Sequence, residues 1–118
     1  MKKRSRKAQL RRKHEFRFFP VEFLNKNGKL IKFKHPAYIF LEKGNIFIYV
    51  TLTHSSDIEN YLVIKLRKNP NRYDKKDSYW IVDFKESTKD KFGRRLNNWI
   101  IDVDDDKEII ERYKKSKE

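Results

Sequence analysis

The sequence contains no cysteine, and it has only three glycines and three prolines among its 118 residues. The absence of cysteine excludes disulfides, thiol nucleophiles and zinc sites built on thiolates, and it is typical of a reducing cytoplasm, where we expect the protein to reside. The glycines stand far apart, at positions 28, 44 and 93. Without a glycine-rich phosphate loop, ATP, GTP and dinucleotide chemistry is not expected.

Long apolar runs and metal-ligand patterns are also missing. No stretch approaches the roughly 18 residues of a membrane span, and no signal-peptide pattern is visible, so we expect no membrane partner. No two histidines have the spacing of metal ligands. The acidic run Asp104-Asp105-Asp106 is better explained as the start of a helix than as a cation site. We therefore expect neither a metal nor another cofactor.

Acidic residues are outnumbered by basic ones, with 17 Asp and Glu against 30 Lys and Arg and a formal net charge of +13. Residues 1–13 carry eight of these cations and no acid. We therefore predict a disordered basic tail over residues 1–14 and one small domain over residues 15–118. Excess positive charge with 14% aromatic residues favours nucleic acid as a partner. Twenty lysines and eight asparagines are also typical of a compositional bias without binding.

The stretch 35–55 organises the rest of the chain. Two runs rich in β-branched and aromatic residues, at 37–41 and 46–52, flank a short polar break. The pair Gly44-Asn45 in that break predicts a hairpin turn, because glycine adopts positive φ without steric cost. Both runs are nearly continuous in apolar residues, so we expect both strands to be largely buried.

The remaining elements follow from turn residues and from the apolar pattern. The pair Asn27-Gly28 predicts a second hairpin turn. Residues 102–117 predict a helix, with acids in its first turn and lysines near its end. Further strands are expected at 16–24, 29–34, 61–66, 79–85 and 99–102. The fold class is therefore mainly β (α+β), a small and strongly bent antiparallel sheet or barrel with a C-terminal helix.

The outer ends of the central hairpin carry side chains that can do chemistry. Lys34 and His35 enter the hairpin, and Thr53, His54 and Ser55 leave it. Because the two ends of a hairpin lie side by side, these side chains are expected to share one rim. RNA cleavage by its own 2′-hydroxyl needs a base, an acid and groups that stabilise charge on phosphorus, and histidines, hydroxyls and cations suffice. The alternatives are a structural histidine before a proline and a purely local polar loop.

Two basic, turn-rich segments accompany the later strands. Residues 67–78 hold five Lys and Arg around the pair Asn69-Pro70, and residues 89–98 are basic around Gly93. Such loops can bind a nucleic-acid backbone, although a charged loop is more often solvated surface. The residues that we assign to nucleic-acid binding are Lys34, Lys65, Arg67, Lys68, Arg72, Arg94 and Arg95.

Several short motifs follow one another in a defined order along the chain. The letters KHP at 34–36 precede the apolar strand AYIFL, and TLTHS at 51–55 ends the next strand. The basic segment IVDFKESTKDKFGRRL, a short strand at 99–102 and a helix from Asp104 follow. This order resembles the MazF/PemK (Kid) family of toxin endoribonucleases. In that family an Arg-Pro precedes the apolar strand, and the next strand ends in Pro-Ile/Leu-Thr before Ser or Thr.

The resemblance covers residues 18–115 and implies an SH3-like, partly open antiparallel β-barrel with a C-terminal helix. It also implies a dimer and an inhibitory partner that occupies the RNA groove. Thr53 corresponds to the family's phosphate-contacting Thr, with His54 and Ser55 beside it. Two departures stand out, because His35 holds the place of the catalytic Arg and Thr51 the place of the Pro. His35 would then have to take the proton-transfer role of the Arg.

The sequence therefore predicts a metal-independent endoribonuclease of toxin-antitoxin or phage-defence type that cleaves single-stranded RNA through attack of the 2′-hydroxyl. The expected catalytic residues are His35, Thr53, His54 and Ser55. The expected partners are RNA, an antitoxin made of protein or RNA, and a second copy of the chain. The alternatives are a non-catalytic basic nucleic-acid-binding module and a protein-interaction module whose charge is compositional.

Overall fold

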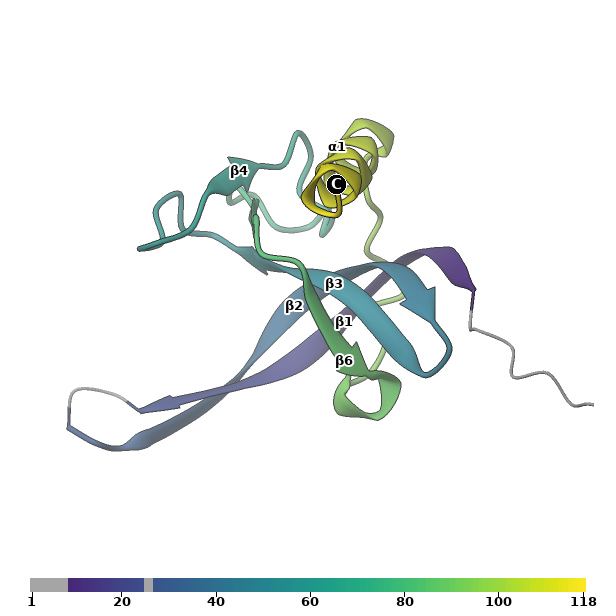
Figure 1. The fold of residues 1–118 in the computed structure, drawn as a ribbon. Coiled ribbons are helices and arrows are strands. Elements are labelled where there is room, and N and C mark those ends of the chain that lie inside the picture. The colour runs from purple at the N-terminus through teal and green to yellow at the C-terminus, as the bar shows by residue number, and fades with distance from the viewer. Residues whose placement is uncertain (1–8, 25–26) are drawn as a thin grey trace, which may run out of the picture.

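The computed structural model describes residues 9–24 and 27–118, which form six strands and one long C-terminal helix (Figure 1). The strands are β1 (Leu10–Leu24), β2 (Leu30–Lys43), β3 (Ile46–Thr53), β4 (Val63–Lys65), β5 (Tyr79–Ile81) and β6 (Lys85–Thr88). A short 3-10 helix (Lys89–Lys91) follows, and α1 spans Val103–Ser116. The predicted mainly β (α+β) class is confirmed, and over the described residues the antiparallel sheet does not close into a barrel.

The two halves of strand β3 pair with different strands on the side away from β2. The sheet has the order β1-β2-β3-β5-β4, and β6 also pairs with β3. Residues 46–49 of β3 pair with β6, whereas Leu52 and Thr53 pair with Trp80 and Tyr79 of β5. Strands β5 and β4, and the loop between them, are thereby brought to the end of β3 that carries Thr53.

The central hairpin forms as predicted. Lys43 pairs with Ile46, so Gly44 and Asn45 make a two-residue turn, and Gly44 has a φ of 58°. The pairing continues to Ala37 opposite Thr51. The end of β3 therefore lies beside the middle of β2, next to the stretch that holds His35, so the two ends of the predicted hairpin meet as the sequence indicates.

Replacement of Gly44 by alanine is expected to lower the free energy of unfolding by about 1 kcal/mol, because an L side chain at positive φ costs roughly that amount. Urea denaturation measures the change. Lys43→Ala is the matched control, since Lys43 is exposed in the same turn, and it should change stability by less than about 0.5 kcal/mol. Equal stability of G44A and wild type would contradict this turn.

The apolar runs of the hairpin are buried on both faces. Successive residues of a strand point to opposite sides, and here each side has its own cluster. One cluster includes Tyr38, Phe40 and Val50 and packs against Trp80 and the α1 residues Ile109, Ile110 and Tyr113. The other consists of Ala37, Ile39, Phe47 and Tyr49, with Phe19 and Phe92 packed against it. Burial on two sides explains why the runs are continuous rather than alternating.

The segment after β6 crosses the second cluster and reaches the outer edge of β1. The rings of Phe92 and Tyr49 meet edge to face, with centroids 5.0 Å apart. The backbone N–H of Gly93 then donates to the carbonyl of Phe18 at 2.8 Å, and that of Leu96 to the carbonyl of Phe16 at 2.7 Å. The basic segment predicted at 89–98 therefore closes over one face of the sheet and covers part of its edge.

Several predicted boundaries are wrong. The strands predicted at 29–34 and 37–41 form one strand, β2, and the strand predicted at 61–66 is shorter, at Val63–Lys65. Residues 99–102 are not a strand, because the hydrogen bond from Ile100 N to the carbonyl of Pro70, at 3.1 Å, is not continued into a ladder. The strand predicted at 79–85 ends at Ile81, where Asp83 N donates to the Ile81 carbonyl in a tight turn. Residues 10–14, predicted as tail, belong to β1. The tail prediction for residues 1–8 lies outside the described residues.

The C-terminal helix begins where the sequence predicts. The side chain of Asp102 accepts hydrogen bonds from the backbone N–H groups of Asp104 and Asp105, which is the usual action of an N-cap. Acids fill its first turn and lysines its last, in line with the helix dipole. No helix among the described residues is both long and apolar enough to cross a membrane.

Candidate active site

A small pocket lies at the outer end of the central hairpin. Its lining comes from the middle of β2, from the end of β3, from the β4–β5 loop and from the segment before α1: His35, Pro36, Leu52, Thr53, His54, Asn69, Asp74, Ser78 and Trp99. Of the five side chains expected to share one rim, His35, Thr53 and His54 line this pocket, and Lys34 and Ser55 do not. Its volume is about 90 Å³, well below the roughly 300–1,000 Å³ of pockets for drug-sized ligands. The pocket therefore suits a small group such as a phosphate rather than a whole nucleotide.

His35 is the half-buried imidazole of this pocket. Burial lowers the pKa of its ring, and a hydrogen bond to the backbone of Leu52 opposes that effect in part. A pKa below the ordinary value of about 6.5 leaves the imidazole neutral at pH 7. A neutral imidazole can accept a proton, which is the property that a general base needs.

His54 is held by the β4–β5 loop on both sides of its ring. Its Nδ1 lies 2.9 Å from the carbonyl oxygen of Asp77, and its Nε2 lies 3.1 Å from Oδ2 of Asp74. The pKa of Asp74 is lowered, chiefly by a hydrogen bond from the backbone N–H of Lys76 and also by the nearby His54. The ionised carboxylate and the carbonyl together fix the orientation of the His54 ring.

The two hydroxyls that leave β3 have different surroundings. Thr53 lines the pocket, and its Oγ1 accepts a hydrogen bond from the backbone N–H of Ser55 at 3.1 Å. Its own hydroxyl hydrogen can still be donated to a ligand. Ser55 does not line this pocket, because its Oγ donates to the carbonyl of Asp57 at 2.7 Å in a local turn. The geometry therefore favours Thr53 over Ser55 as a contact to phosphate.

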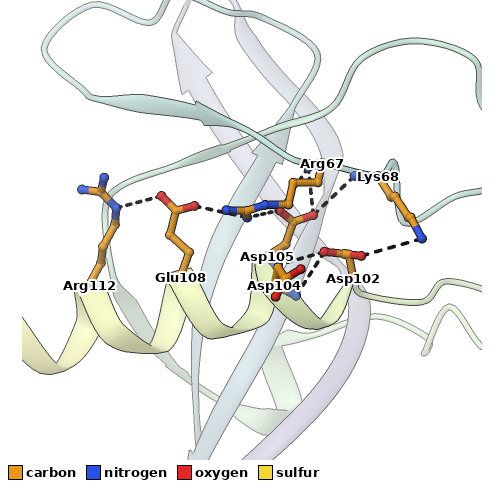
Figure 2. Close-up of polar contacts among 7 residues, drawn as sticks. All are labelled: Arg67, Lys68, Asp102, Asp104, Asp105, Glu108 and Arg112. Atoms are coloured by element: carbon orange, nitrogen blue, oxygen red, sulfur yellow. Dashed lines mark hydrogen bonds and ion pairs between the residues drawn. The ribbon is translucent and has the colours of Figure 1, made fainter.

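Arg67 belongs to an ion-pair network with helix α1 (Figure 2). Its Nη1 lies 2.9 Å from Oδ1 of the buried Asp105 and 3.3 Å from Oε1 of Glu108. The backbone N–H of Arg67 also donates to both oxygens of Asp105. Glu108 continues the network to Arg112. This network docks the start of the β4–β5 loop on the helix, so the charge of Arg67 is largely used within the protein.

The other predicted cations lie in different environments. Lys65 is 3.4 Å from Asp77, with both side chains well exposed, and Arg95 is 3.9 Å from Glu15. Lys34, within β2, and Arg94, in the crossing segment, are exposed. Lys68 and Arg72 both line a groove that adjoins the pocket. The structure therefore brings two of the predicted nucleic-acid contacts, Lys68 and Arg72, to one place near the histidines.

Six lining residues were not assigned to the site, and four of these come from outside the central hairpin: Asn69, Asp74, Ser78 and Trp99. Three of them belong to the β4–β5 loop, whose composition predicts a basic, irregular segment and no partner for it. The carbonyl of Ser78 accepts from Leu66 N at 2.9 Å, which ties the two ends of that loop together. The closed loop folds back on the hairpin, and no local pattern signals that return.

Comparisons of the chain with protein-family models, with curated proteins and with solved structures return no match. The resemblance to the MazF/PemK toxins therefore stays a prediction from the residues. In the part of the chain that the structure describes, no group of three or more His, Cys, Asp or Glu side chains is placed to hold a metal ion.

Proposed function

We propose that this protein is a metal-independent endoribonuclease of the MazF/PemK toxin type that cleaves single-stranded RNA at the hairpin pocket. The observation that carries the proposal is the convergence of His35, Thr53 and His54 on one small pocket. A half-buried imidazole with a lowered pKa stands there beside a hydroxyl that can donate. The same resemblance supports an antitoxin, of protein or RNA, and a second copy of the chain as partners.

The proposed reaction uses a nucleophile that the RNA supplies. His35 takes the proton of a 2′-hydroxyl, whose oxygen attacks the adjacent phosphorus and forms a new P–O bond. The bond from phosphorus to the 5′-oxygen breaks, and that oxygen receives a proton from His54 or from water. The Thr53 hydroxyl donates to a non-bridging oxygen and stabilises the charge that builds there. The products carry a 2′,3′-cyclic phosphate and a 5′-hydroxyl.

Incubation of the purified protein with single-stranded RNA in EDTA tests the proposal. We expect cleavage without added metal and products that end in 2′,3′-cyclic phosphate, identified by mass spectrometry. An all-2′-deoxy strand of the same sequence is the matched substrate control, because it lacks the nucleophile and must stay intact. RNA that remains intact at every protein concentration, or a DNA strand that is cut as well, would contradict the mechanism.

A non-catalytic RNA-binding module is the second candidate, and the contacts of His54 favour it. Both ring nitrogens of His54 already face acceptor oxygens of the protein, so this ring is held within the protein, as a purely structural histidine would be. Binding that weakens steeply with salt while the RNA is recovered intact selects this candidate, because phosphate contacts release counterions.

A further inference from the structure

We propose that a groove beside the pocket binds the nucleotide next to the scissile phosphate of single-stranded RNA. The groove lies between the β4–β5 loop and the start of α1, with Lys68, Pro70, Arg72, Asn98, Ile100 and Val103 among its lining residues. Its volume of about 330 Å³ falls within the range of sites for drug-sized ligands. The inference rests on the proposed function, since it names a substrate subsite of the same site.

Groove and pocket share a wall. Asn69 lines both, and its side chain is fixed within the loop. Its Nδ2 donates to the carbonyl of Lys76 at 2.8 Å, and its Oδ1 accepts from Asn71 N at 3.0 Å. The hydrogen bond from Ile100 N to the Pro70 carbonyl joins the two sides of the groove. If a phosphate of an RNA strand enters the pocket, the adjacent nucleotide therefore meets the groove on the other side of Asn69.

The floor of the groove is apolar and open to water. Ile100 is 70% exposed and Val103 is 78% exposed, and both line the groove. These two exposed aliphatic side chains leave apolar surface in contact with water. A ligand with a flat apolar face could cover that surface. All four nucleobases have such a face, so this contact does not depend on the RNA sequence. The exposed amide of Asn98, at the rim, can donate to or accept from a base edge.

Two cationic side chains, Lys68 and Arg72, also line the groove and could contact the phosphate of the bound nucleotide. The Lys68 side chain is 80% exposed, and its Nζ is 3.9 Å from Oδ1 of Asp102 (Figure 2). Asp102 also lines the groove, but its Oδ2 is taken by the backbone N–H groups at the start of α1. The Arg72 guanidinium lies 5.0 Å from the ring centroid of the exposed Tyr73, a pairing on which a base can also stack. This combination of charge and apolar floor selects RNA as the occupant.

The test measures binding separately from cleavage. The probe is a short fluorescein-labelled 2′-O-methyl RNA, which cannot be cut because it lacks the 2′-hydroxyl, and anisotropy gives its Kd at several salt concentrations. The variants are Ile100→Ser with Val103→Ser, and Lys68→Ala with Arg72→Ala. The control is Lys114→Ala with Lys115→Ala, which removes the same charge from exposed positions at the other end of α1.

We expect the serine pair to weaken binding about threefold or more with an unchanged salt slope, because apolar contact with the base is lost but no phosphate contact is. The alanine pair should weaken binding more and reduce the slope by about 1.4, the value for two phosphate contacts to a single strand. Wild-type affinity of the serine pair overturns the subsite. So does an equal loss in the control pair, or no binding of the probe at all, which would leave the groove to a protein partner. Loss in both groove variants with no RNA cleavage by wild type would keep the subsite and refute the nuclease.

Discussion

Replacement of His35 by alanine is expected to lower the rate of RNA cleavage by about a hundredfold or more, the usual contribution of a general base. His35 is the half-buried imidazole of the pocket, and its lowered pKa leaves it ready to accept a proton at pH 7. Single-turnover cleavage of a defined RNA measures the loss. His14→Ala is the matched control, because the His14 side chain is exposed and stands beside Asp106, away from the pocket-lining residues.

The pH dependence of the same rate separates a proton-transfer role from a structural one. His35 acts as a base only when neutral, so the rate should rise with pH through its pKa and then level off. Because burial lowers that pKa, the midpoint of the acidic limb should lie below the ordinary 6.5. An acidic limb that is unchanged in residual H35A activity, or a midpoint above 6.5 in wild type, would contradict this role. A shared melting temperature of H35A and wild type shows that the loss is not unfolding.

The central hairpin was predictable because its signals are local. Two runs of β-branched and aromatic residues around Gly44-Asn45 fix a turn, and the turn fixes which ends meet. The meeting of His35 and Thr53 at one pocket follows from that geometry alone. The tertiary contacts did not follow, since the position of the β4–β5 loop depends on the buried Asp105 of α1 and its bonds to Arg67.

Charge is where the sequence misleads most. Considered alone, the cations of residues 1–13 suggest a disordered tail, and the acids at 104–106 suggest only the start of a helix. In the structure Arg12 and Asp106 form an ion pair across the molecule, and this contact accompanies the extension of β1 back to Leu10. Propensity cannot reveal that two distant charged segments neutralise each other.

Asp106→Ala is expected to destabilise the fold by about 3 kcal/mol. Its Oδ1 accepts from the hydroxyl of Tyr38 at 2.5 Å, and both carboxylate oxygens accept from Nη2 of Arg12 at 2.6 and 2.8 Å. Tyr38 is fully buried, and burial together with the Asp106 carboxylate raises the pKa of its hydroxyl far above 10, so that it remains a donor. Removal of the Asp106 carboxylate leaves the Tyr38 hydroxyl without an acceptor in the core.

The size of this effect is set by burial rather than by the number of contacts. Losing one partner of a buried pair costs about 3–5 kcal/mol, but the Arg12 side chain is 40% exposed, and water screens its share. We therefore place the loss at the lower end of that range and assign most of it to the unpaired hydroxyl of Tyr38.

Asp104→Ala is the control, since Asp104 is exposed in the same helical turn, and it should cost less than about 1 kcal/mol. Tyr38→Phe should cost only about 1 kcal/mol, because it removes the donor and leaves no unpaired hydroxyl in the core. The Asp106 carboxylate keeps its hydrogen bonds from Arg12. Urea denaturation of the three variants decides, and equal stability of D106A and D104A would show that this carboxylate does not join β1, β2 and α1.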